Sequence, residues 1–223
     1  AIRFRYYLDI IELNSIGFDS LMSKKEVFRL KKIEDFPQKN IPDSSLLLHS
    51  CCAPCSSSVL ERLTELFKIT VLYYNPNIYP EAEFEKRAGE QNDFISRFKI
   101  GSNINFVKEP YDSSEFFNAV AGFENEKEGG ARCLICYRLR LEKTAMLAKR
   151  QGFDYFTTTL SVSPHKNAKL INELGCELEK KYNIQFLYSD FKKNNGYLRS
   201  IELSKKYNLY RQNYCGCIYS KKD

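Results

Sequence analysis

The sequence predicts an α/β fold with a doubly wound, mostly parallel sheet and an N-terminal appendage. From residue 45 onward, short apolar runs alternate with longer stretches of helical pattern. Strands that are separated by helices pair in parallel, and the helices cover both faces of the sheet. The chain has 223 residues, which is enough for a substantial core, and shows no internal repeat. We therefore expect one main domain with an appendage.

The apolar runs predict five strands in chain order. The first is the leucine run 46–48, and the second is the apolar run 69–74. The others are residues 105–108, 155–159 and 185–188. Ligands of such sheets bind beyond the carboxyl ends of the strands. The segments that follow the first and fourth strands are therefore expected at the functional edge.

The helical patterns predict the connections between these strands. Helices are expected at residues 56–67, 81–98 and 113–121, then from a turn at Cys133 to about residue 150, and at residues 169–182. Residues 1–44 are expected to form an N-terminal extension and linker, because a charged helical pattern there is followed by a segment bounded by Pro37 and Pro42. The main domain is then residues 45–223.

The sequence predicts a cytoplasmic protein with no membrane segment. No apolar run approaches the roughly 18 residues that a membrane helix requires. The N-terminus mixes charged residues into its apolar ones, unlike a signal peptide. Eight cysteines in a chain this long and this charged favour metal ligation or redox cycling over a disulfide scaffold.

Seven of the eight cysteines fall in three tight clusters. These are Cys51, Cys52 and Cys55, then Cys133 and Cys136, then Cys215 and Cys217. Clusters so far apart in sequence indicate one metal site assembled from three loops. Thiolates select zinc, copper(I) or iron–sulfur clusters, and seven are more than one tetrahedral zinc can take. An iron–sulfur centre, a zinc site and thiol–disulfide chemistry all stay open at this point, whereas the isolated Cys176 is expected to be a buried core residue.

Other candidate residues lie beside these clusters. The loop after the first strand contains no glycine, so a phosphate-binding loop of the ATP-dependent kind is not supported. His49 and His165 lie at the expected functional edge. The formal charge of +6 fits nucleic-acid binding or a solvated basic surface. Basic residues are interleaved with tyrosines near the second and third clusters, an arrangement that can hold phosphates and stack bases.

Four motifs in this order resemble the cobalamin-independent epoxyqueuosine reductase family of the QueH type. They are His49-x-Cys51-Cys52-Ala53-Pro54-Cys55, Cys133-x-x-Cys136-Tyr137-x-x-Arg140, the segment from Thr158 to Lys166, and Tyr214-Cys215-Gly216-Cys217. The resemblance covers residues 45–223. It implies a nucleotide-hydrolase-like (HUP-like) fold and an oxidoreductase that converts epoxyqueuosine to queuosine at the wobble position of tRNA.

The resemblance also implies cofactors and roles. Cys51, Cys52, Cys133 and Cys136 would bind a [4Fe-4S] cluster. Cys215 and Cys217 would be a redox-active pair, or would join Cys55 as ligands of an additional iron ion. Independently of the resemblance, the position of His49, His165 and Tyr137 beside the motifs makes them hypothetical proton donors. The basic residues Arg138, Arg140 and Lys166 are hypothetical contacts to tRNA phosphates. The electron donor is expected to be a separate protein.

One alternative is a zinc-stabilised RNA-binding module without catalysis, in which the cysteines are purely structural. A second alternative is a thiol oxidoreductase that acts on proteins and requires no tRNA. The first predicts a colourless protein that unfolds when its metal is chelated. The second predicts disulfide cycling.

Overall fold

A computed structural model describes residues 44–98 and 104–221 of the chain. The predicted extension, apart from residue 44, therefore lies outside the described residues. Five strands form one sheet in the order β3-β2-β1-β4-β5, and every pairing in it is parallel. The prediction of a mostly parallel α/β fold is confirmed.

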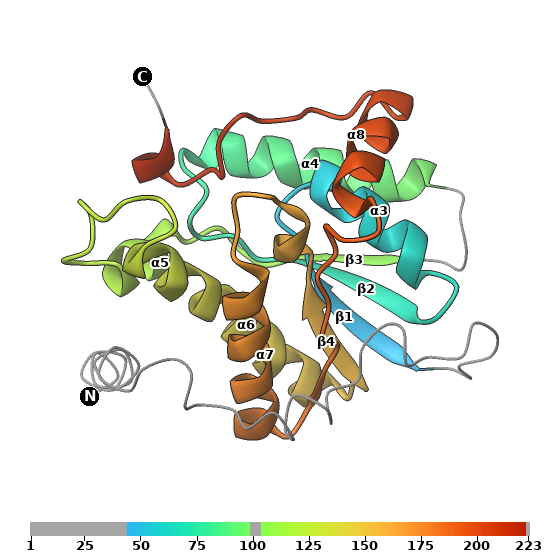
Figure 1. The fold of residues 1–223 in the computed structure, drawn as a ribbon, viewed down its shortest axis with the longest axis horizontal. Coiled ribbons are helices and arrows are strands. Elements are labelled where there is room, and N and C mark those ends of the chain that lie inside the picture. The colour runs from blue at the N-terminus through green and yellow to red at the C-terminus, as the bar shows by residue number, and fades with distance from the viewer. Residues whose placement is uncertain (1–43, 99–103, 222–223) are drawn as a thin grey trace.

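The strands and helices alternate along the chain as the sequence predicted (Figure 1). The strands are β1 (Ser45–His49), β2 (Lys68–Tyr73), β3 (Asn105–Lys108), β4 (Tyr155–Thr158) and β5 (Gln185–Phe186). The helices are α3 (Ala53–Leu63), α4 (Glu81–Arg97), α5 (Ser113–Ala119), α6 (Ala131–Gln151), α7 (Ala168–Tyr182) and α8 (Gly196–Lys206). Two short 3₁₀ helices, η3 (Thr159–Val162) and η4 (Ile218–Ser220), complete the described elements.

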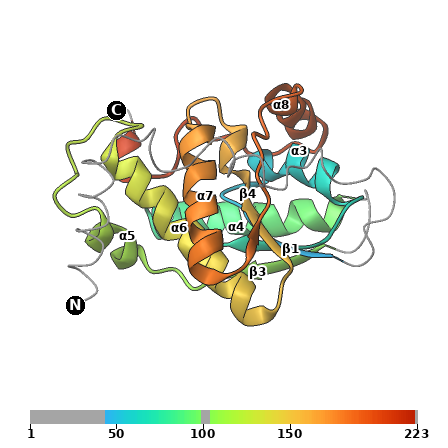
Figure 2. The ribbon, with the colours of Figure 1, turned by 60° about the horizontal axis from the view of Figure 1, so that its bottom comes forward.

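Two layers of helices cover the sheet, and side chains on β1 alternate between them. Leu47 packs in a core cluster with residues of α6 and α7, whereas Leu46 and Leu48 pack with residues of α3 and α4. This period of two is what a strand buried on both faces requires. Figure 2 shows α6 and α7 together on one face, with α3 and α8 together on the other. The doubly wound arrangement is thus confirmed.

Several predicted boundaries differ from the structure. Helix α3 begins at Ala53, three residues before the predicted start, and ends at Leu63. Its early start places Cys55 in the first helical turn. Helix α8 had no predicted counterpart. None of the helices in the described part of the chain combines the length and the apolar character needed to cross a membrane.

Candidate metal and redox site

The first cysteine cluster lies at the point where the strand order reverses. The chain proceeds from β1 outward to β2, and β4 returns to pair with the other side of β1. Loops at the carboxyl ends of two such strands diverge and leave a crevice. Cys51 and Cys52 follow β1 directly, and Cys52 is the N-cap residue of α3. The prediction that this loop lies at the carboxyl edge of the sheet is confirmed.

The second cluster also lies at the beginning of a helix. Cys133 is in the first turn of α6, and Cys136 follows one turn later. The backbone N–H of Gly129 donates to Cys133 Sγ at 3.2 Å. Unpaired N–H groups at a helix N-terminus favour negative charge. Burial nevertheless raises the pKa of Cys136 to about 11.

The third cluster lies in an irregular segment near the C-terminus. Gly216, between Cys215 and Cys217, has a φ of 100°, a conformation that glycine adopts without strain. Cys215 Sγ lies 2.9 Å from Ser220 Oγ. Cys217 is buried in a small cluster that contains Cys136 and Phe116. This packing connects the third cysteine cluster to the second.

The closest group of thiols is Cys51, Cys52 and Cys55, whose sulfur atoms all lie within 4.8 Å of one another. Cys51 Sγ and Cys52 Sγ are 3.9 Å apart. Two sulfurs on a tetrahedral ion with metal–sulfur bonds of about 2.3 Å are about 3.8 Å apart. The spacing therefore suits metal ligation. Cys133 packs against the same core cluster as Cys51 and Cys52, while Cys176 is buried in the core on α7, as predicted.

Charge is distributed unevenly among these thiols. Hydrogen bonds from the thiols of Cys52 and Cys55 hold the pKa of Cys51 well below its ordinary value. The same hydrogen bond to Cys51 raises the pKa of Cys55 to about 12. Likewise, a hydrogen bond from Cys217 lowers the pKa of Cys215. Each group thus presents one thiolate supported by neighbouring thiols.

Two cations lie close to these thiolates: Arg140, which is buried, and Lys166, which is half-buried in the pocket wall. Burial alone would lower the pKa of Lys166, but the charges of Cys51, Cys55 and Cys215 raise it above its ordinary value. Arg140 is 3% exposed, and its pKa is raised by Cys136 and Cys51 against the opposing effect of burial. Both side chains therefore stay charged and offset the negative charge of the site.

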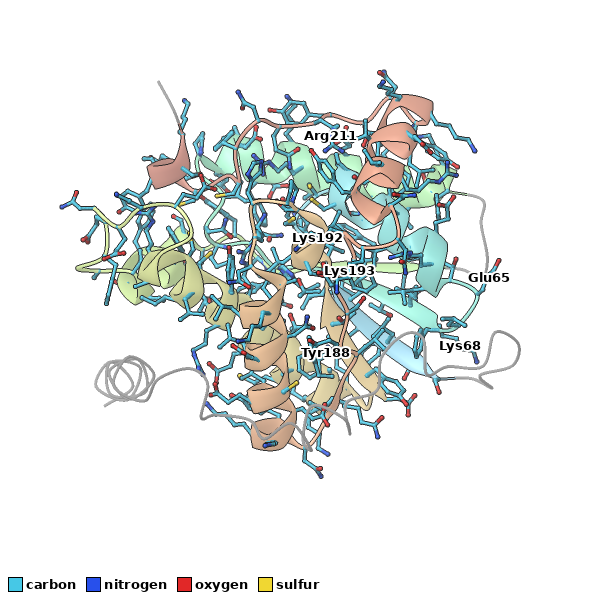
Figure 3. All side chains as sticks on the ribbon, in the orientation of Figure 1. Glu65, Lys68, Tyr188, Lys192, Lys193 and Arg211 are labelled. Atoms are coloured by element: carbon cyan, nitrogen blue, oxygen red, sulfur yellow. The ribbon has the colours of Figure 1, made fainter. Side chains whose placement is uncertain are left out.

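A pocket of about 780 Å³ opens over the thiols. Its wall combines four cysteines with basic and aromatic residues: Cys51, Cys52, Cys55, Cys215, Arg87, His165, Lys166, Tyr197, Arg211 and Tyr214. Arg211 lies on the segment that leads from α8 towards η4 (Figure 3). The volume is within the roughly 300–1,000 Å³ usual for pockets that enclose small molecules.

The hypothetical proton donors occupy different surroundings. His165 lines the pocket. Tyr137 is buried near Lys166, and burial raises the pKa of its phenol. His49 is fully buried and does not line the pocket. Its Nε2 donates to the carbonyl oxygen of Tyr74 at 3.1 Å, so Nδ1 accepts from the Thr158 hydroxyl at 2.8 Å. Burial lowers the pKa of His49 to about 4, and the neutral ring joins the ends of β1 and β4.

The three residues that were hypothetical contacts to tRNA phosphates also lie in different surroundings. Arg138 directs both terminal nitrogens to the carboxylate of Glu177 on α7 and is 3% exposed. Arg140 donates from Nε to the carbonyl oxygen of Cys136. Of the three residues, Lys166 is the one that lines the pocket. Phosphate binding by all three stays a prediction, and the structure gives both arginines protein partners.

The sequence analysis did not identify Arg87 or Ser220, which also line the pocket. Ser220 carries no sequence signal beyond its nearness to Cys217. Arg87 follows Glu83 by four residues on a helix, which is the ordinary pattern of a surface ion pair. The structure instead leaves Arg87 1% exposed.

A parallel α/β sheet with a thiol-lined pocket at its switch point defines a protein with a thiolate metal or redox site. The family model of "Epoxyqueuosine reductase QueH" matches residues 46–223. The chain therefore belongs to the epoxyqueuosine reductase QueH family, and it is an oxidoreductase. The resemblance seen in the four sequence motifs is confirmed.

Curated members of this family are similar over most of the chain. The epoxyqueuosine reductase QueH of Streptococcus pyogenes serotype M1 is 48% identical over 180 residues, which are 80% of this chain and 71% of the relative. That of Staphylococcus epidermidis is 43% identical over 86% of this chain and 82% of the relative. That of Staphylococcus aureus is 44% identical over 86% and 81%, respectively.

Proposed function

We propose that this protein reduces epoxyqueuosine to queuosine at the wobble position of tRNA, with an iron–sulfur cluster and a second redox centre at the thiol-lined pocket. The observation that carries the proposal is the placement of three cysteine clusters close together in a member of this family: cysteines of the first and third clusters line one pocket, and the second cluster packs against both. The substrate follows from the activity for which the relatives are named. We propose residues 45–223 as the catalytic domain.

The donor set fits an iron–sulfur cluster. Thiolates are the usual ligands of such clusters, and the site offers cysteines at two helix N-termini, together with the positive charges of Arg140 and Lys166. We assign Cys51, Cys52, Cys133 and Cys136 as cluster ligands. When bound, the cluster supplies electrons for the reduction.

Cys215 and Cys217, with Cys55 nearby, form the second centre in this proposal. One form is an additional iron ion held by these thiols. The other is a dithiol, whose oxidation to a disulfide releases two electrons and two protons. Conversion of an epoxide to an alkene consumes two electrons and two protons and releases one water, so the dithiol balances the reaction. The contact between Cys215 and Cys217 supports either form.

The protein groups around the pocket position the substrate and hold protons. We propose that Tyr137 or His165 donates a proton, because Tyr137 lies near Lys166 and His165 lines the pocket. His49 stays a weaker candidate, since both ring nitrogens already have protein partners. The test measures the single-turnover rates of the Tyr137→Phe and His165→Gln variants at saturating tRNA. The residue whose replacement slows turnover without changing tRNA affinity is the donor, and full turnover removes a residue from the mechanism.

The proposed partners are tRNA that contains epoxyqueuosine and a separate electron-donor protein. The pocket is large enough for a nucleoside, and Lys166 and Arg211 give it positive charge. An anticodon loop presents its bases without base-pairing, so protein side chains can reach the wobble base.

The composition of the centre is tested by the visible absorption and the iron, sulfide and zinc content of protein purified without oxygen. We expect a brown protein with a broad absorption band at about 400 nm that bleaches on reduction. A Cys215→Ser/Cys217→Ser double variant should lose the iron that exceeds one four-iron cluster if these thiols bind iron. It should keep all its iron, but not its turnover, if they act as a dithiol.

Colourless wild-type protein with about one zinc would contradict the redox mechanism. It would favour the zinc-stabilised RNA-binding module, which should bind tRNA without reducing it. Disulfide cycling without any tRNA requirement would favour the thiol oxidoreductase instead.

A further inference from the structure

Helix α4 holds the C-terminal segment that carries Cys215 and Cys217. Residues 207–217 lie outside regular secondary structure and run beside α4 (Figure 1). Arg97 Nη1 donates to the carbonyl oxygen of Tyr207 at 2.9 Å, and the backbone N–H of Tyr210 donates to Glu90. Lys86 Nζ lies 3.5 Å from the centre of the Tyr210 ring. Polar side chains of one helix thus position this segment.

Arg87 is the residue of α4 that reaches the cysteine pair. Its Nε donates to Glu83 Oε1 at 2.7 Å, and its Nη1 donates to the carbonyl oxygen of Cys215 at 3.3 Å. The side-chain oxygen of Gln212 accepts from the same Nη1 at 3.2 Å in the amide orientation that satisfies both of its ends. The guanidinium carbon lies 5.1 Å from the centre of the Tyr214 ring. One buried side chain therefore contacts three residues of the segment.

The third guanidinium nitrogen of Arg87, Nη2, indicates what the pocket binds at this position. Nη2 is buried and has no hydrogen-bond partner among residues 44–98 and 104–221. Arg87 also lines the pocket and lies within electrostatic reach of Cys52 and Cys51. A buried N–H donor without an acceptor is costly, and the cost is greater for a charged group. The position therefore suits an acceptor in the site, either a sulfur of the metal centre or an oxygen of the substrate.

Gly216 allows the backbone between the two cysteines to pack closely against Arg87. A Cβ atom there would lie 2.8 Å from Ile78 Cγ1 and 3.1 Å from Arg87 Nη1. The carbonyl oxygen of Gly216 accepts from the backbone N–H of Tyr79 at 3.0 Å. The backbone between the two cysteines thus lies against Ile78 and the guanidinium.

We propose that Arg87 is a positioning residue for the reduction, which fixes Cys215 against the thiol pocket and supplies a buried positive charge beside Cys51 and Cys52. The assignment of a redox role to this position rests on the proposed function. Because Arg87 holds Cys215 through its backbone carbonyl, its removal frees the loop while every thiol stays in the chain.

The test compares Arg87→Met with Arg97→Met in full-length protein purified without oxygen. Both changes remove an arginine-to-carbonyl hydrogen bond between α4 and the same segment, but Arg97 lies away from the thiols. We expect amide hydrogen exchange of residues 212–217 to accelerate roughly 10- to 100-fold in Arg87→Met, as expected for loss of a charged hydrogen bond. The midpoint potential of the metal-loaded protein should fall, because a positive charge next to the centre favours its reduced form. Arg97→Met should leave both quantities at wild-type values.

Arg87→Lys separates the two parts of the proposal. It keeps the charge, so the potential should stay near that of the wild type, but it lacks the planar fork, so exchange should still accelerate. If Arg87→Met does not fold, Gln212→Ala removes one partner of Nη1 and should accelerate exchange in the same residues to a smaller degree.

Unchanged exchange and unchanged potential in Arg87→Met would overturn the proposal. Failure of the proposed function has a different signature, since wild-type protein would then not reduce epoxyqueuosine in tRNA. The exchange comparison would still report whether Arg87 holds the loop.

Discussion

Replacement of Cys51 with serine is expected to strip the metal centre and abolish epoxyqueuosine reduction. Cys51 is the thiolate of the first cluster, since the thiols of Cys52 and Cys55 both donate to it. A serine hydroxyl has almost the same shape but is not ionised near neutral pH, and it is a poor ligand for metals that prefer sulfur. Loss of an outer-shell partner typically costs roughly 10- to 100-fold in metal affinity or activity. Loss of a direct ligand should exceed that range.

The measurements are iron and sulfide content, visible absorption and single-turnover reduction of tRNA. Cys176→Ser is the matched control, because it makes the same chemical change at a buried cysteine of α7. We expect the control to keep its metal and its turnover and to lose about 1–2 kcal/mol of stability, since the hydroxyl is buried in an apolar core. Full iron content in Cys51→Ser would remove Cys51 from the ligand set and assign its place to another thiol, with Cys55 the nearest candidate.

Local sequence signals predicted most of the fold. Strands β1 and β2 lie within one residue of their predicted positions, because apolar runs of strand length are visible in the sequence alone. Helix α8 had no such signal. It begins at Gly196 after Asn194 and Asn195, both of which have positive φ, so its start has the composition of a turn. Its partner is α3, far away in the sequence.

The parts of the candidate site that lie at the ends of strands could be predicted from the sequence. The parts that depend on burial by distant segments could not. The loop after β1 follows from the rule for parallel sheets. The burial of Arg140 could have been predicted from helical spacing, since residues 133, 136, 137 and 140 share one face of α6. Because of its charge, Arg140 was instead predicted to contact tRNA phosphates. The burial of Arg87 could not have been predicted, because it is created by the C-terminal segment that lies across α4.

Replacement of Lys166 is expected to have the second large effect on turnover. The result distinguishes a role in catalysis from a role in phosphate binding. The loop of Lys166 is held in place: the backbone N–H of Lys166 donates to the carbonyl oxygen of Ser163 at 3.2 Å, and Lys192 Nζ donates to its carbonyl oxygen at 3.3 Å. Lys166 is half-buried and lines the pocket, and the charges of Cys51, Cys55 and Cys215 raise the pKa of its ammonium. Removal of one group that stabilises charge in an active site typically slows turnover about 100- to 1,000-fold. Lys166→Met should therefore slow single turnover about 100-fold or more.

The same variant should bind tRNA with nearly wild-type affinity and an unchanged dependence on salt. The affinity is measured with tRNA at several salt concentrations, and Lys193→Met is the control, because Lys193 is an exposed lysine on a neighbouring segment (Figure 3). If Lys166 contacts a phosphate instead, its removal weakens binding at low salt and reduces the slope of log K against log salt by about 1. Turnover at saturating tRNA would then be preserved. Each role changes one readout and leaves the other unchanged, because charge compensation at the thiols acts on the chemical step, whereas a phosphate contact acts on tRNA binding.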